Sequence, residues 1–128
     1  MAVEEADELQ TIARPGDVLV AASDGVLDNL FEARIQVHVA QLVGSLLSAD
    51  PLVAQGAADE CAQAIAAESQ AVGLREDDET VRTPFGVAAA QEGYKFAGGK
   101  LDDVAVVVGV VRGGQDSPPP RLMHNFAQ

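Results

Sequence analysis

The chain has 128 residues, and its 20 acidic against 8 basic side chains give a formal net charge of −12. This charge argues against nucleic acid as a partner, because phosphate binding requires clustered lysine and arginine. A hydrophobic content of 48 % is enough to build a core, one cysteine excludes an internal disulfide, and no apolar run is long enough to cross a bilayer. We therefore expect one anionic domain without membrane insertion, and the acidic start of the chain predicts no targeting segment within it.

The first third of the chain predicts two strands and a helix. Alternating apolar residues at 9–13 predict a short strand, and the continuous apolar run at 18–22 predicts a strand covered on both faces. The Pro15-Gly16 pair between them is typical of a turn, so we expect a hairpin. Apolar residues then recur at helical spacing and predict one helix over 32–47.

The remaining elements are predicted by caps and by apolar runs. Asp50-Pro51 is typical of a helix start, and the predicted helix continues to about residue 68. Its apolar side consists of Ala54, Ala57, Ala58, Cys61 and Ile65. Residues 73–83 predict an exposed loop, 84–91 a short helix, and the valine-rich run at 104–111 a strand. Glycine, serine and proline then predict a disordered tail over 113–128.

The chain predicts too few strands to bury the apolar residues that these strands carry. Two of them read as buried on both faces, whereas a sheet needs more strands or a second layer to cover both faces and its edges. We therefore expect this chain either to be part of a larger domain or to pack against another copy.

Acidic residues flank the two most apolar strands. Asp24 follows the first directly, and Asp102 with Asp103 precedes the second. If the strands are adjacent and antiparallel, Asp24 and Asp102 lie on the same rim, where carboxylates suit a hard divalent cation such as Mg²⁺ or Mn²⁺. Gly25 would let the backbone turn sharply beside the ion. The alternative is two ordinary turns, which composition alone favours because Asp and Gly are common in turns.

Three stretches carry a family resemblance. Residues 16–30, Gly-Asp-Val-Leu-Val-Ala-Ala-Ser-Asp-Gly-Val-Leu-Asp-Asn-Leu, resemble the late Asp-Gly motif of the metal-dependent type two C (PPM) protein serine/threonine phosphatases. Residues 98–107 resemble their final Asp-Asn or Asp-Asp motif, and 83–94 are similar to the branch found in plant and algal plastids and in mitochondria. The resemblance implies an α+β fold, half of an α-β-β-α sandwich with antiparallel sheets, incomplete as a phosphatase domain.

The resemblance also implies roles for individual residues. Asp24 falls on a metal-bridging aspartate, Asp102 on a second metal ligand, and Asp28 on an acid of a weaker third metal site. Asp103 stands where Asn is common and would support the site rather than bind metal. Two or three Mg²⁺ or Mn²⁺ ions would activate a water that attacks phosphoserine or phosphothreonine in a protein substrate. No side chain is then needed as the nucleophile, so no residue is assigned a direct catalytic role.

The departures from the family pattern define the alternatives. The family's earlier Asp-Gly motif, further ligands and phosphate-binding arginine have no counterpart here, so we expect residues 1–112 to be the C-terminal part of such a domain. The missing N-terminal half would be its partner, the isolated chain would be inactive, and the resemblance points to a plastid or mitochondrion. One alternative is a catalytically dead regulatory or interaction module on the same scaffold. Another is an acidic cation-binding structural domain, which predicts that Asp24 and Asp102 lie far apart.

Overall fold

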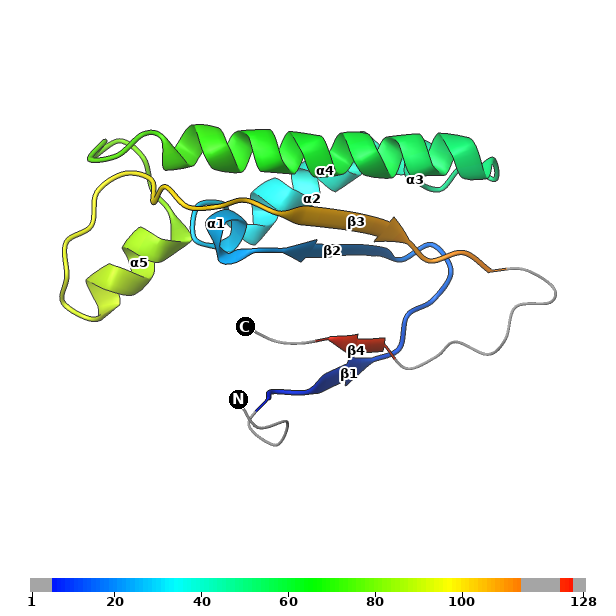
Figure 1. The fold of residues 1–128 in the computed structure, drawn as a ribbon, viewed down its shortest axis with the longest axis horizontal. Helices are drawn as coiled ribbons and strands as arrows, with labels where there is room; N and C mark the ends of the chain where they lie inside the picture. Colours follow the sequence, from blue (N-terminus) through cyan, green and yellow to red (C-terminus); the bar gives the residue numbers. More distant parts are fainter. Residues whose placement is uncertain (1–5, 114–122, 126–128) are drawn as a thin grey trace.

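The computed structural model describes residues 6–113 and 123–125 (Figure 1). In chain order its elements are β1 (Leu9–Thr11), β2 (Val18–Ala22), α1 (Asp24–Leu27), α2 (Glu32–Gln41), α3 (Val43–Leu46), α4 (Pro51–Gly73), α5 (Pro84–Gln91), β3 (Val106–Val110) and β4 (Met123–Asn125). Two antiparallel pairs, β1–β4 and β2–β3, form separate two-stranded sheets. This combination of helices and antiparallel strands confirms the predicted α+β class.

The β2–β3 pair is the centre of the structure. Its register runs from Val18 opposite Val110 to Ala22 opposite Val106, and α4 lies along the pair (Figure 1). Side chains of both strands pack against buried residues of α4, whereas Val107 on the other face is 68 % exposed. The prediction that these strands are buried on both faces is therefore wrong for this chain, which supplies a helical layer to one face.

The predicted hairpin between residues 9–13 and 18–22 is also wrong. The Gly16 amide donates to the Val111 carbonyl and the Val111 amide donates to the Asp17 carbonyl, at 2.8 and 2.9 Å. These bonds extend the pairing of β2 and β3 to residues 16, 17 and 111. The segment before β2 therefore lies beside the end of β3 and does not form a hairpin turn between β1 and β2. Strand β1 pairs with β4 instead.

The prediction of a disordered tail over 113–128 is wrong for strand β4. Met123–Asn125 lies within the stretch predicted to be a disordered tail, yet it pairs with β1 from Leu9 opposite Asn125 to Thr11 opposite Met123. Backbone pairing gives the polar groups of both short segments hydrogen-bond partners, which composition does not reveal. Residues 114–122 and 126–128 lie outside the described residues, and the proposed division at residue 112 stays a prediction.

Helix α4 follows its sequence signals closely. The Asp50 carboxylate accepts a hydrogen bond from the Leu52 amide at 2.9 Å, and Pro51 occupies the first turn. All five predicted apolar residues are buried, and the stripe continues through Ser69 and Gly73, so the helix ends five residues beyond the predicted end at 68. The Ser69 hydroxyl donates to the Ile65 carbonyl at 2.7 Å, which lets a polar side chain continue the buried stripe.

The helix predicted over 32–47 is divided in two. Leu42 separates α2 from α3, and its amide bonds to the Val39 carbonyl three residues back, which tightens the turn. Helix α3 then places Leu46 with no exposed surface against Ala57 and Ala58. Helix α5 has the predicted bounds. Within residues 6–113 and 123–125, no helix combines the length and the apolar character that a membrane span requires.

Candidate metal centre

The end of β2 is joined to the start of β3 by the backbone and side chain of Ser23. Its amide donates to the Ala105 carbonyl at 2.9 Å, its hydroxyl donates to the Asp103 carbonyl at 3.2 Å, and the same hydroxyl accepts from the Ala105 amide at 2.9 Å. A Cβ on Gly25 would overlap the Asp103 carbonyl oxygen. Glycine is therefore required because the segment that precedes β3, here called the second segment, passes very close to the backbone of residue 25. The sharp turn expected from the sequence is not the reason.

The second segment is positioned by the end of α4 and the loop that follows. Gly98 has φ +80° and bridges to Glu76, and the Gly99 amide donates to the Arg75 carbonyl at 3.0 Å. A Cβ on Gly99 would overlap the Val72 carbonyl oxygen. The Gly98-Gly99 pair thus lets the chain run against the backbone of α4 and its loop, and it leads directly into Lys100 and Asp102.

Asn29 connects the two segments through hydrogen bonds of its side chain. Its side chain is 3 % exposed, and its amide nitrogen donates to the carbonyls of Gly25 and Lys100 at 2.8 and 2.7 Å. Its amide oxygen accepts from the Lys100 backbone amide at 2.8 Å. Sequence reasoning did not identify Asn29, and its position directly after Asp28 in the Asp-Gly motif is the one signal that could have pointed to it.

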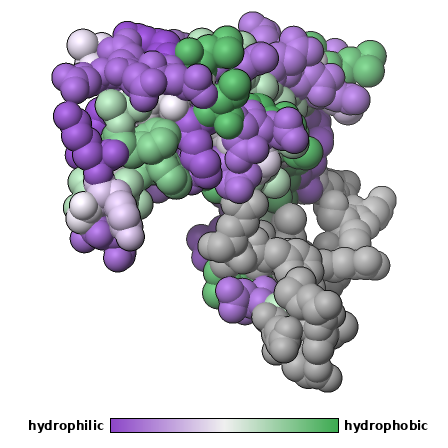
Figure 2. All heavy atoms as spheres, turned by 60° about the vertical axis from the view of Figure 1, so that its left-hand side comes forward, coloured by the Kyte–Doolittle hydropathy of each residue, from purple (hydrophilic) through white to green (hydrophobic). Residues whose placement is uncertain are grey.

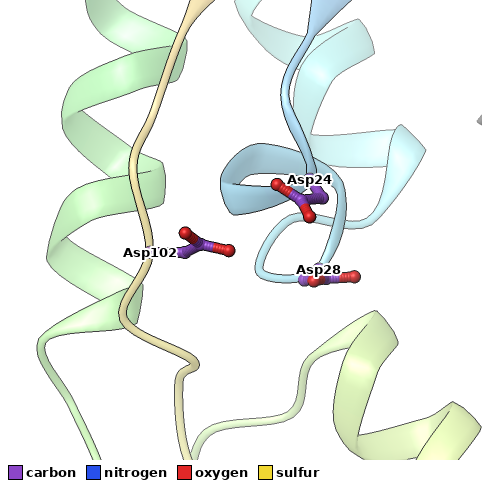
Figure 3. Close-up of side chains that lie close together, drawn as sticks. All are labelled: Asp24, Asp28 and Asp102. Carbon is purple, nitrogen blue, oxygen red and sulfur yellow. The ribbon is translucent and has the colours of Figure 1, made fainter.

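Three carboxylates meet where these segments converge. Asp24 begins α1 and Asp28 caps its end, so both lie on the same side of one helical turn. Asp102 comes from the segment before β3, and its carboxylate points across the gap toward the other two (Figure 3). Each of the three offers an oxygen, and these oxygens all lie within 4.8 Å of one another. The wide separation of Asp24 and Asp102 that the alternative of an acidic cation-binding structural domain predicts is therefore not found.

The donor set suits a hard divalent cation. It consists of carboxylate oxygens, with Asp24 and Asp102 exposed and Asp28 half-buried, which matches the ligands that Mg²⁺ and Mn²⁺ prefer. One oxygen of Asp102 also accepts from the Asp103 amide at 2.8 Å, which orients the carboxylate. Asp103 therefore contributes through its backbone. The end of the molecule that carries α5 comes forward in Figure 2, and its surface combines hydrophilic residues with a hydrophobic patch.

A lysine partly neutralises this cluster. The ammonium of Lys100 lies 3.0 Å from an Asp28 oxygen and 4.5 Å from the centre of the Phe85 ring. The hydrogen bond to Asp28, and the negative charges of Asp28, Asp102 and Asp24, raise the pKa of Lys100. Three carboxylates and one ammonium still leave a negative centre, which favours a divalent cation.

Comparison with known proteins places this geometry in a family context. The probable protein phosphatase 2C 55 of Arabidopsis thaliana is 38 % identical over 102 residues, which cover 80 % of this chain and 19 % of that protein. The probable protein phosphatase 2C 71 of Oryza sativa subsp. japonica is 45 % identical over 98 residues, covering 76 % and 18 %. No protein-family model matches the chain.

A solved structure supports the fold independently. The photosystem II phosphatase PBCP superposes with a TM-score of 0.57 at 24 % identity, covering 78 % of this chain and 38 % of that one. The resemblance drawn from the motifs is thereby confirmed: the chain is a relative of the protein phosphatase 2C proteins and has the fold of part of such a domain. It spans about a fifth of the length of the two curated relatives.

Proposed function

We propose that this chain supplies one side of the metal centre of a type two C protein serine/threonine phosphatase. In this proposal Asp24 and Asp102 hold Mg²⁺ or Mn²⁺, and Asp28 contributes to a third, weaker position. The observation that carries the proposal is the convergence of three carboxylates from two distant segments within 4.8 Å. Both segments belong to the motifs on which the family resemblance was based.

The chemistry assigns separate tasks to the residues of the site. Divalent cations, when bound, supply the Lewis acidity that activates water for attack on a phosphate ester. Asp24 and Asp102 would hold the cations, while Ser23 and Asn29 fix the distance between the two segments from which these aspartates come. The motif resemblance and the protein phosphatase names of the relatives support phosphoserine and phosphothreonine side chains of proteins as the substrates. A metal-activated water would make a nucleophilic side chain unnecessary.

The described arginines support the second part of the proposal, that the isolated chain does not turn over substrate. A phosphate group approaching an acidic cluster needs a cationic side chain to bind its oxygens. Arg14 precedes β2, at the opposite end of this strand from Asp24. Arg34 bonds Glu68, Arg75 bonds Asp78, Arg112 donates to the Ser48 and Ala49 carbonyls, and Arg82 lies 5.1 Å from the centre of the Phe31 ring. The last four guanidinium groups are thus engaged with other partners, and we propose that further sequence of the phosphatase supplies the phosphate ligand.

An apolar groove beside β2 supports the same conclusion. It has a volume of about 720 Å³, lies between β2 and α2, and is lined mainly by aliphatic side chains such as Val20, Leu30 and Ile35. In its described sheet, β2 pairs with β3 alone, so its other edge has no strand beside it. We propose that the remainder of a phosphatase domain, corresponding to sequence that the longer relatives carry, covers this groove.

Binding of Mn²⁺ to the 128-residue chain tests the metal site. We expect electron paramagnetic resonance of free Mn²⁺ to show binding that Asp24→Asn and Asp102→Asn each weaken by roughly tenfold or more, because each removes a charged ligand. Asp59→Asn, on the exposed side of α4, is the matched control and leaves binding unchanged. Equal binding by all four proteins would exclude these aspartates as ligands.

Hydrolysis of p-nitrophenyl phosphate tests the missing phosphate ligand. With Mn²⁺ present, we expect the isolated chain to hydrolyse it no faster than buffer, although it binds the metal. Rapid Mn²⁺-dependent turnover would show that the chain is complete as a catalyst. A catalytically dead module on the same scaffold gives the same result in this assay, and an Asp-Gly motif in frame upstream of Met1 in the genomic sequence would distinguish the phosphatase from it. The plastid or mitochondrial location stays a proposal, supported by the motif at 83–94 and by the name of the photosystem II phosphatase neighbour.

A further inference from the structure

Lys100 is held at three points beside the acidic cluster. The Asn29 side chain bonds both its backbone amide and its backbone carbonyl, at 2.8 and 2.7 Å. Its ammonium donates to Asp28 at 3.0 Å. The consecutive residues Asp28 and Asn29 thus bind the side chain and the backbone of the same lysine, and this lysine comes from the opposite segment of the site.

The position of the ammonium is further defined by an aromatic pair. It lies 4.5 Å from the Phe85 ring centre, and the Phe85 amide donates to the Asp28 carbonyl at 3.0 Å. Phe85 in turn packs edge-on against Phe96, with ring centres 4.8 Å apart. About a third of the Lys100 side chain and a quarter of the Asp28 side chain are exposed. This geometry differs from that of a freely solvated surface lysine, whose ion pairs are loose and weak.

We infer that Lys100 supplies a permanent positive charge to the centre. Its ammonium binds the Asp28 carboxylate and thereby restricts divalent cations to the side of Asp24 and Asp102. The inference rests on the proposed function, since it requires Asp24 and Asp102 to bind a divalent cation and Asp28 to be the weaker position of the site. A cation that uses Asp28 has to displace the ammonium or lie next to it. Because hydrogen bonds from Asn29 hold the Lys100 backbone in place, the ammonium is always available to compete with a divalent cation for Asp28. Its positive charge also repels any divalent cation that lies nearby. Lys100 is thus a residue that sets how many ions the site binds and how tightly.

Removing the charge while keeping the side chain's length tests this inference. Lys100→Met retains an unbranched chain against Phe85 and frees Asp28, whereas Lys100→Arg keeps the positive charge. We expect Mn²⁺ titrations of the full chain to show that Lys100→Met tightens the weakest binding step by roughly tenfold, as the loss of a neighbouring like charge predicts. Lys100→Arg binds Mn²⁺ as the original chain does. Lys100→Gln is a second neutral variant, to be used with circular dichroism as the check of folding.

A double variant shows whether the gain acts through Asp28. Adding Asp28→Asn to Lys100→Met should abolish the increase, because the freed ligand is removed again. If the original chain binds Mn²⁺ through Asp24 and both neutral Lys100 variants bind it equally or more weakly, the inference is wrong while the proposed metal site stands. If neither the original chain nor any Lys100 variant binds Mn²⁺, both proposals fail.

Discussion

The sheet face under α4 and the rim at the end of β2 lie next to each other but are held together by different interactions. Under α4, Val26, Cys61 and Ile65 have no exposed surface, and they contact one another and the strands through apolar atoms. At the rim, Asn29 and Ser23 connect the segments through hydrogen bonds to backbone groups. Apolar contacts are non-directional and stabilise the whole fold, whereas hydrogen bonds are directional and fix the separation of two particular segments.

This difference teaches that stability and site geometry can be changed separately. A substitution under α4 should lower the free energy of unfolding and leave the metal affinity of the folded chain unchanged. A substitution at the rim should lower stability less and alter Mn²⁺ binding more. Each of the following experiments therefore measures urea unfolding and Mn²⁺ binding on the same protein.

The largest expected loss of stability comes from Ile65→Ala. Ile65 is fully buried between α4 and the β2–β3 pair, so truncation removes apolar contacts and leaves a cavity, at a cost of about 3 kcal/mol in the free energy of unfolding. Leu52→Ala on the same helix is the control, because Leu52 is 79 % exposed and its loss should change stability by no more than about 0.5 kcal/mol. A loss below 1 kcal/mol for Ile65→Ala, or weaker Mn²⁺ binding by the folded variant, would contradict the separation of the two regions.

Asn29→Ala addresses the rim and should have an intermediate effect on stability. It removes three hydrogen bonds and leaves the buried Gly25 carbonyl and the partly buried Lys100 amide and carbonyl without these partners, which costs about 2 kcal/mol. Because Gly25 and Lys100 are then no longer connected, we expect the Mn²⁺ affinity to fall together with stability. Gln36→Ala is a suitable control, since Gln36 is exposed and its amide bonds only another side chain, Glu32. Unchanged Mn²⁺ binding by a less stable Asn29→Ala protein would show that Asn29 has no role in positioning the site.

The same division explains which features could be predicted from the sequence. The buried stripe of α4, its Asp50 cap and the bounds of α5 depend on local spacing and capping, which a single sequence displays. The pairing of β1 with β4 and the contacts of Asn29 depend on residues far apart in the chain, and no local pattern encodes them. The aspartates of the site were found through the strands that precede or follow them and through the family motifs. The role of Gly25 could not be found in this way, because it depends on the Asp103 carbonyl of another segment.

The smallest expected effect concerns Glu68, which connects α4 to α2 and lies outside both regions. Burial alone would raise the pKa of Glu68, but hydrogen bonds from Arg34 and His38, 2.8 Å from its two oxygens, together hold the pKa below its ordinary value. A carboxylate with a lowered pKa in the folded state contributes stability above its unfolded pKa, near 4.3, and this contribution is lost as the pH falls through the folded pKa. Because the pair is partly exposed, Glu68→Gln should cost about 1 kcal/mol or less at pH 7.

The pH dependence distinguishes this electrostatic contribution from simple packing. We expect the difference in unfolding free energy between the original chain and Glu68→Gln, measured by urea unfolding, to be nearly the same at pH 7 and pH 5 and to be smaller at pH 3, since protonated Glu68 resembles glutamine. Glu60→Gln, an exposed change on the same helix, corrects for the general effect of removing one negative charge from a chain of net charge −12. A difference that stays constant down to pH 3 would mean that Glu68 stabilises the α2–α4 contact through its shape. The contact would then belong with the apolar core, and the directional interactions of this protein would be concentrated at the rim.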